Sequence, residues 1–123
     1  MSDLEKLLFD SCRKINIELN DRQIKQFMDY KDMLLEWNEK MNLTAITDER
    51  EIMLKHFADC LIINSAVETS GKNIIDVGTG AGFPGVPVKI ADPSVKMTLL
   101  DSLNKRITFL NELTKKLELD NVD

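Results

Sequence analysis

The sequence predicts an α/β protein, with an N-terminal helical segment followed by the first strand–helix–strand–helix units of a parallel sheet. Apolar residues recur at helical spacing over residues 1–69. Two short apolar runs after residue 70 have the length and composition of strands. A glycine-rich turn separates the first run from the next helical pattern. We therefore expect a helical lobe at 1–69 and an α/β domain that begins at 70–123.

Two capping patterns mark the first helices. Ser2 and Glu5 have the spacing of a capping box, in which each side chain bonds the other residue's backbone N–H. Asn20 and Gln23 repeat the pattern, and apolar residues at helical spacing follow. The sequence therefore predicts one helix from the N-terminus and a long one over about residues 21–40.

The pattern changes near Gly71. A third helix is predicted after Thr47, whose hydroxyl is expected to cap it. Beyond Gly71, residues 73–77 and 95–100 are predicted strands, with a helix that ends near residue 91 between them.

Ser102 is expected to cap a last helix, and the order strand, helix, strand, helix implies a parallel sheet. Two parallel strands cannot be buried on both faces and both edges, and a third strand is expected to begin at 121–123. We therefore expect the N-terminal part of a longer, doubly wound protein with roughly 100 residues to follow. The exposed sheet edge predicts self-association of this piece, whereas the intact protein is expected to be a monomer.

Composition excludes several classes of protein. The chain is 43% hydrophobic and 30% charged, unlike disordered or collagen-like chains. Its longest apolar run, residues 60–63, is far shorter than a membrane span. The N-terminus lacks the pattern of a secretion signal. The two cysteines are too few for a disulfide framework, so we expect free thiols in a reducing cytoplasm.

The net charge is −5, so a broad basic surface for nucleic acid is absent. The scattered basic side chains are expected to be a solvated helical surface. The alternative is that Lys40, Arg50 and Lys55 border a local patch facing RNA. The acidic excess of residues 1–69 leaves a further alternative, a non-enzymatic helical module that binds a partner protein.

The segment 76–85, DVGTGAGFPG, points to a nucleoside-containing cofactor. Glycines in a strand-to-helix turn let the backbone approach a ligand and direct N–H groups at it. Asp101 follows the second strand, where a carboxylate can accept hydrogen bonds from both ribose hydroxyls. The alternative is that the glycines only form a tight turn and Asp76 only caps the helix.

Two cofactors fit this pattern. Residues 80–85 have the G-x-G-x-x-G spacing of dinucleotide-binding oxidoreductases of the NAD type. Lys105 and Arg106 would then bind a 2′-phosphate, or else simply begin an exposed helix. Asp76, just before the first glycine, is unfavourable beside a pyrophosphate but suits the ammonium and sulfonium charges of S-adenosylmethionine. This acid therefore favours S-adenosylmethionine.

The segments 41–47, 55–61, 76–87 and 99–106 closely resemble, in order, those of the RsmG (GidB) family. The resemblance implies a Rossmann-like, S-adenosylmethionine-dependent methyltransferase that acts on 16S rRNA of the small ribosomal subunit. The implied product is N7-methylguanosine in the decoding-site loop. Cys60 departs from the serine expected there.

The motif and the resemblance together imply a set of cofactor-binding residues. Gly78 would contribute backbone and Phe83 an apolar wall, although Phe83 is also interpretable as a core aromatic beneath the turn. Asp101 would bind ribose. The full predicted set is Asp76, Gly78, Gly80, Gly82, Phe83, Asp101, Ser102 and Leu103.

Methylation of guanine N7 needs no general base, because N7 already presents a lone pair, so no catalytic side chain is required. His56, the single histidine, is expected to orient the helix that covers the cofactor, or else to lie near the substrate. No cysteine or histidine spacing suggests a metal site.

Overall fold

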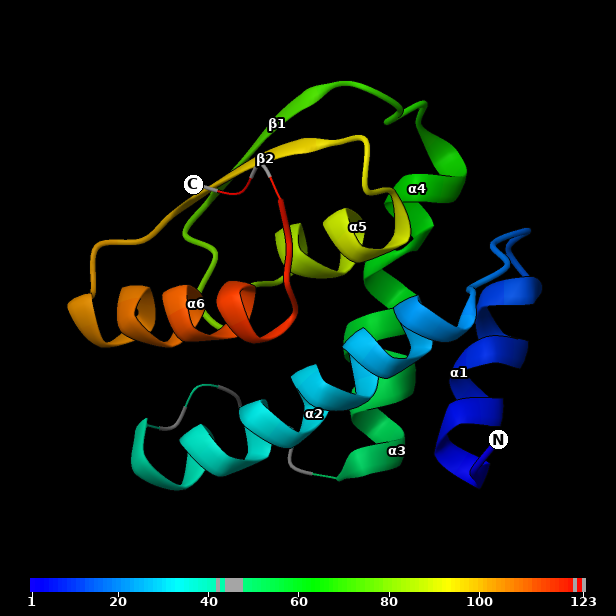
Figure 1. Ribbon diagram of the computed structural model, residues 1–123, viewed down its shortest axis with the longest axis horizontal. Helices are drawn as coiled ribbons and strands as arrows, with labels where there is room; N and C mark the ends of the chain where they lie inside the picture. The colour runs from blue at the N-terminus through cyan, green and yellow to red at the C-terminus, as the bar shows by residue number, and fades with distance from the viewer. Residues whose placement is uncertain (42, 44–47, 121, 123) are drawn as a thin grey trace.

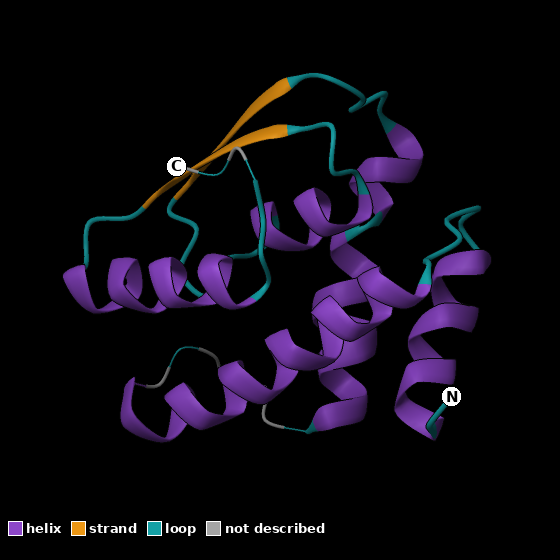
Figure 2. Ribbon diagram, in the orientation of Figure 1, coloured by secondary structure: helices purple, strands orange, loops and turns teal. Residues whose placement is uncertain are grey.

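The computed structural model describes residues 1–41, 43, 48–120 and 122. Helices come first, and strands and helices then alternate (Figures 1 and 2). In chain order the elements are α1 Asp3–Arg13, α2 Asp21–Met41, α3 Glu49–Glu51, the π-helix η1 Ile52–Ala58, α4 Ile62–Ala66, β1 Asn73–Val77, α5 Gly85–Ala91, β2 Lys96–Leu100 and α6 Asn104–Lys116.

Both capping boxes are confirmed. Ser2 N donates to Glu5 Oε1 at 2.9 Å, and Glu5 N donates to Ser2 Oγ at 3.2 Å. Asn20 and Gln23 exchange the same pair of bonds, each at 2.8 Å. Each box supplies acceptors for backbone donors that the first turn of a helix leaves without intrahelical partners. The long helix α2 begins one residue after Asn20, as the sequence predicts.

The third predicted helix is divided into short pieces. Thr47, its expected cap, lies outside the described residues. Asp48 caps α3 by accepting from the N–H groups of Arg50 and Glu51 at 2.8 and 3.2 Å. The chain then widens into the π-helix η1, which the sequence pattern did not predict. Such single π turns are rare in proteins and often occur at functional sites.

The predicted strands form a parallel pair. β1 and β2 align from Asn73 opposite Lys96 to Val77 opposite Leu100, so both carboxyl ends lie at the same edge. Val122 forms a parallel bridge to Met97, at the place where a third strand was predicted. Its neighbours at 121 and 123 lie outside the described residues.

The described helices leave one face of the sheet bare. Figure 2 shows α5 and α6 on the same side of the strands, with α2 beyond them. Ile75 and Val77 point to the other side and are 62% and 77% exposed, and Leu100 is 47% exposed. This alternation along β1 is the pattern of a sheet covered on one face.

The core is continuous from the N-terminal helices to α6. Fully buried side chains from α1, α2, η1, α5 and α6 belong to one cluster. Trp37 of α2 packs edge-on against Phe109 of α6, with ring centroids 5.4 Å apart. Gln23 Nε2 donates to the Ile90 carbonyl at 3.0 Å, which joins α2 to the end of α5. Among the described residues, no helix is both long and apolar enough to cross a membrane.

The start of α6 differs from the prediction. Ser102 was expected to cap this helix, but the N-cap residue is Leu103, and no side chain caps through it. Asp101 Oδ1 instead accepts the Leu103 N–H at 3.0 Å. An aspartate bonds readily to the N–H two residues further on, and this bond sets the turn in which exposed Ser102 lies.

A buried lysine closes the connection between α5 and β2. The Lys89 side chain lies along the core, and the residue is 2% exposed. Its ammonium donates to the carbonyls of Pro93 and Val95 at 2.6 and 2.5 Å. Burial lowers the pKa of Lys89, an effect that nearby Asp120 and Asp92 oppose. The buried charge is thus compensated by hydrogen bonds, as buried charges require.

Replacing Lys89 with methionine keeps the buried stem but removes the donor to both carbonyls. We expect the free energy of unfolding to fall by about 1.5–3 kcal/mol, the range for hydrogen bonds to a charged group. Urea denaturation followed by circular dichroism measures the change. Lys6→Met, on the exposed side of α1, is the matched control and should stay within about 0.5 kcal/mol of wild type. An unchanged midpoint for Lys89→Met would contradict a stabilising role for the two hydrogen bonds of Lys89.

Candidate functional site

A hollow of about 380 Å³ lies at the carboxyl ends of the two strands. In open α/β sheets, ligands bind outside this edge of the sheet. The hollow is lined by Val77, Gly78, Leu100, Asp101, Ser102 and Arg106. It therefore contains residues from both turns that the sequence singled out.

The glycine-rich turn leaves β1 through a left-handed backbone. Gly78, Gly80 and Gly82 have φ of 71°, 58° and 97°, values that side chains strongly disfavour. The N–H groups of Gly78 and Thr79 donate to the Leu100 carbonyl at 2.8 and 3.1 Å. The turn after β1 is therefore anchored on the last residue of β2.

The glycines differ in what surrounds them. A Cβ added at Gly78 or Gly80 would meet no atom within 4 Å. A Cβ at Gly82 would lie 2.6 Å from Tyr30 Oη and 2.8 Å from Val86 Cγ2. Gly78 and Gly80 thus face open space, whereas Gly82 is pressed against the core.

Asp101 lies against the glycine turn. Its Oδ2 accepts the Gly80 N–H at 2.9 Å, and its Oδ1 accepts the Leu103 N–H. Arg106 Nη1 approaches Oδ2 at 3.5 Å, and the Asp101 side chain is only 2% exposed. The Leu103 N–H, then the Gly80 N–H and Arg106, lower the pKa of Asp101, while burial acts in the opposite sense. The carboxylate therefore remains ionised at neutral pH.

Asp76 has the capping role that the sequence left open. Its Oδ2 accepts from Thr79 Oγ1 at 2.7 Å and from the Gly85 N–H at 2.9 Å. Gly85 is the first residue of α5, so this oxygen takes up a backbone donor that the helix start leaves free. The same carboxylate oxygen accepts both bonds.

Phe83 lies in an aromatic stack. Its ring is nearly parallel to that of His56, with centroids 4.2 Å apart, and to that of Tyr30, with centroids 5.5 Å apart. The packing matches the alternative of a core aromatic beneath the turn. Burial lowers the pKa of His56, although Asp59 raises it, so the imidazole is neutral at pH 7. The neutral His56 ring packs against Phe83, close to the end of the glycine-rich turn.

The structure brings most of the predicted residues together. The Gly80 N–H bonds Asp101, and Gly78, Asp101 and Ser102 line the same hollow. Asp76 lies in β1 and bonds the start of α5. Leu103 is 51% exposed, and its backbone N–H donates to Asp101.

Sequence reasoning missed three contributors. In the sequence, Tyr30 looks like any buried residue of a helix. Nothing in its spacing predicts a hydrogen bond to Ala81, 51 positions away. Arg106 lies in the first turn of α6 with a 41% exposed side chain, as one of the two interpretations expected, but its contact with Asp101 was not considered. Thr79 occurs within the glycine motif, where its hydroxyl donor to Asp76 was not considered.

The cysteines, the basic side chains and possible metal ligands complete the list of candidate functional groups. Burial raises the pKa of Cys12 to about 11 and that of Cys60 to about 12, so both thiols are protonated at neutral pH. Lys55, a candidate for the RNA-facing patch, forms an ion pair with Glu51 at 3.4 Å. Within the described part of the chain, no group of three or more histidine, cysteine or acidic side chains is arranged for a metal.

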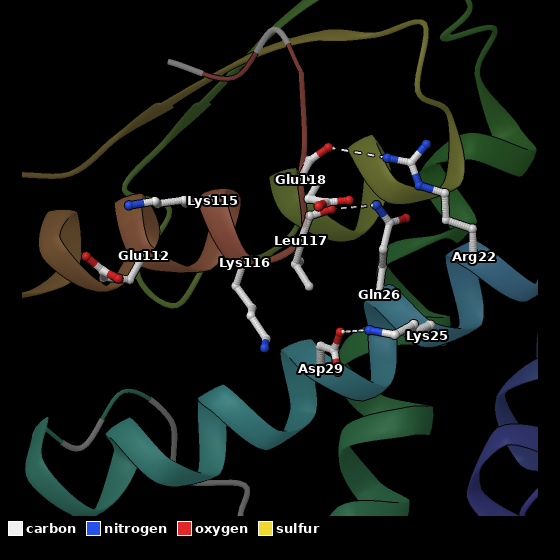
Figure 3. A pocket seen from close by; sticks show the side chains of 9 residues that line it. All are labelled: Arg22, Lys25, Gln26, Asp29, Glu112, Lys115, Lys116, Leu117 and Glu118. Carbon is white, nitrogen blue, oxygen red and sulfur yellow. Dashed lines mark hydrogen bonds and ion pairs between the residues drawn. The ribbon is translucent and has the colours of Figure 1, made fainter.

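A larger hollow of about 580 Å³ lies between α2 and the carboxyl end of α6 (Figure 3). Its charges nearly balance, because four basic side chains face three acidic ones. Lys25 pairs with Asp29 at 2.8 Å, and Gln26 Nε2 donates to the Leu117 carbonyl at 2.8 Å. The Lys25–Asp29 pair lies within α2. The Gln26 bond joins α2 to the C-cap residue of α6, at the far end of α6 from Asp101.

Comparison with known proteins identifies the family. The model of the GidB family, described as rRNA small subunit methyltransferase G, matches residues 23–123. A ribosomal RNA small subunit methyltransferase G from Alkaliphilus metalliredigens is 53% identical over 118 residues, which cover 95% of this chain and 49% of that protein. The protein of the same name from Alkaliphilus oremlandii is 54% identical over 123 residues, with 98% and 51% covered.

A third relative of that name, from Clostridium perfringens, is 54% identical over 118 residues, 95% of this chain and 49% of the relative. The chain thus spans about half the length of the curated relatives it matches. The match over residues 23–123 includes both strands and the glycine-rich turn. The chain belongs to the GidB family, the family of rRNA small subunit methyltransferase G.

Proposed function

We propose that this chain contributes the first half of the cofactor site of an S-adenosylmethionine-dependent methyltransferase with a Rossmann-like fold. The observation that carries the proposal is the 2.9 Å hydrogen bond from the Gly80 N–H to Asp101 Oδ2. It brings the acid after β2 against the glycine turn after β1, next to the hollow at the carboxyl edge. This arrangement suits a nucleoside, because it offers open backbone on one side and a carboxylate for ribose on the other.

The residues present fit the cofactor. The ribose hydroxyls would bind Asp101 in place of the long 3.5 Å contact from Arg106. Gly78 and Gly80 offer space and backbone for the methionine end, and Ser102 lines the adenosine side. The Asp76 carboxylate would favour the positive charges of S-adenosylmethionine electrostatically. The cofactor supplies an electrophilic methyl group, and the protein's part is to hold and orient it.

We further propose that the methyl acceptor is N7 of a guanine in 16S rRNA, within the small ribosomal subunit. The relatives' names state ribosomal RNA of the small subunit, and the guanine follows from the family resemblance. The proposed reaction needs no catalytic base, and neutral His56 is consistent with a packing role beside Phe83. This substrate places the reaction in the bacterial cytoplasm.

Calorimetric titration tests the cofactor assignment. S-adenosylmethionine and NAD⁺ are titrated separately into the chain under the same conditions. We expect heat of binding from S-adenosylmethionine alone, because Asp76 lies where a pyrophosphate would be repelled. Preference for NAD⁺ would establish the dinucleotide alternative, and binding of neither would favour the helical interaction module.

Replacing Asp101 with alanine removes the acceptor for the ribose hydroxyls. We expect the affinity for S-adenosylmethionine to fall at least about tenfold, since a hydrogen bond to a charged group contributes about 1.5–3 kcal/mol. Calorimetry measures the affinity, and circular dichroism checks that the variant folds. Asp10→Ala, on the exposed side of α1, should bind as wild type does. Unchanged affinity in a folded Asp101→Ala variant would remove this residue from the site.

Gly78→Ala and Gly82→Ala separate the ligand side of the turn from the core side. At Gly82 the methyl group would collide with Tyr30 and Val86, so we expect a loss of about 2–5 kcal/mol in unfolding free energy. At Gly78 only the positive φ costs stability, about 1–2 kcal/mol, but the methyl group enters the hollow and should weaken S-adenosylmethionine binding. Thermal unfolding and calorimetry measure the two effects. A Gly82→Ala variant as stable as wild type would refute the distinction.

A further inference from the structure

The glycine-rich turn is hydrogen-bonded on its buried side by a side chain of the N-terminal helices. Tyr30 of α2 is completely buried, and its hydroxyl donates to the Ala81 carbonyl at 2.5 Å. Ala81 lies at the middle of the turn and is itself only 4% exposed. Burial above all, together with the nearby Asp76 carboxylate, raises the pKa of the Tyr30 hydroxyl, so it remains a donor. A buried carbonyl therefore receives its hydrogen bond from a residue 51 positions earlier.

The Tyr30 ring contacts the same turn a second time. It stacks on Phe83 with an interplanar angle of 13°, and His56 of η1 covers Phe83 with an interplanar angle of 4°. Phe57, also of η1, has its ring centroid 5.0 Å from that of Tyr30 and 6.2 Å from that of Phe83. The end of the turn is thus enclosed by rings from α2 and η1.

The backbone at Gly82 is fitted to the tyrosine hydroxyl. A Cβ on Gly82 would lie 2.6 Å from Tyr30 Oη, so the hydroxyl occupies the space that any side chain would need. The Gly82 and Phe83 N–H groups in turn donate to the Thr79 carbonyl at 2.9 and 3.1 Å. The hydroxyl, the missing side chain and the turn's own hydrogen bonds therefore define one conformation of residues 79–83.

We propose that Tyr30 is a positioning residue for the cofactor turn. Its hydroxyl fixes residues 79–83 so that Gly78 lines the hollow and Gly80 faces open space before any ligand arrives. The N-terminal helices therefore shape the binding site, although Tyr30 itself does not line the hollow. This inference rests on the proposed function, because it takes S-adenosylmethionine as the ligand of that turn. Preorganisation of this kind raises affinity by lowering the entropy lost on binding.

Tyr30→Phe tests the proposal, because it keeps the ring stack and removes only the hydroxyl. The first measurement is amide hydrogen exchange of the ligand-free chain, read on a peptide that covers residues 78–84. We expect exchange there to be about fivefold faster, the ratio that corresponds to the loss of one ordinary hydrogen bond. Exchange in α1 and β2 should stay as in wild type. Unchanged exchange over 78–84 would overturn the proposal without reference to any cofactor.

The second measurement is the affinity for S-adenosylmethionine, which we expect to fall about fivefold in the same variant. Leu8→Val, a core truncation in α1, controls for a general loss of stability, and should lower the melting temperature while leaving both the turn's exchange and the affinity unchanged. Equal losses of affinity in Leu8→Val and Tyr30→Phe would assign Tyr30 a merely structural role. Faster exchange with wild-type affinity would also overturn the positioning role.

The two measurements distinguish failure of the Tyr30 proposal from failure of the proposed function. If the wild-type chain binds no S-adenosylmethionine, the proposed function fails. The exchange measurement still decides whether the Tyr30 hydroxyl holds the turn, because it uses the ligand-free protein.

Discussion

The hydrogen bond between the Gly80 N–H and Asp101 is the contact on which the site's shape depends. A two-stranded parallel sheet aligns the carboxyl ends of its strands, but it does not fix the turns that follow them. The bond between these turns draws the backbone after β1 onto the side chain after β2. The Gly78 and Thr79 N–H groups also bond the Leu100 carbonyl. Together these bonds hold the two turns side by side, so that residues of both line the hollow.

The N-terminal helices support that wall through a shared core. Helix α2 packs against both α5 and α6, and its polar side chains reach backbone carbonyls in each region: Gln23 bonds Ile90, and Gln26 bonds Leu117. Tyr30 makes another such connection, to Ala81. A buried carbonyl without a donor is costly, so these bonds specify how the helices and the α/β part fit together. The structure thereby connects the helical segment to the glycine-rich turn.

Several residues combine a structural role with the proposed ligand role. One Asp76 oxygen holds Gly85 and Thr79, which secures the start of α5. Phe83 packs between His56 and Tyr30. In both cases the interpretation in terms of packing and the interpretation in terms of binding are compatible, because the same contacts that stabilise the turn also determine what faces the hollow. The supporting shell and the site are built from the same side chains.

The sequence by itself determined the local elements and the residues of the turn. Capping pairs such as Ser2 with Glu5, the period of α2 and the strand at 73–77 depend on near neighbours, and all agree with the structure. The order of strands and helices also predicted the parallel pairing. Local signals failed at the π-helix η1 and at Ser102, where competing contacts from Asp101 and the core decide the geometry. Only the tertiary structure decided that Gly82 faces Tyr30 whereas Gly78 faces open space. The physical reason is that such contacts join segments far apart in the chain, and spacing along a sequence carries no record of which distant side chain fills a given gap.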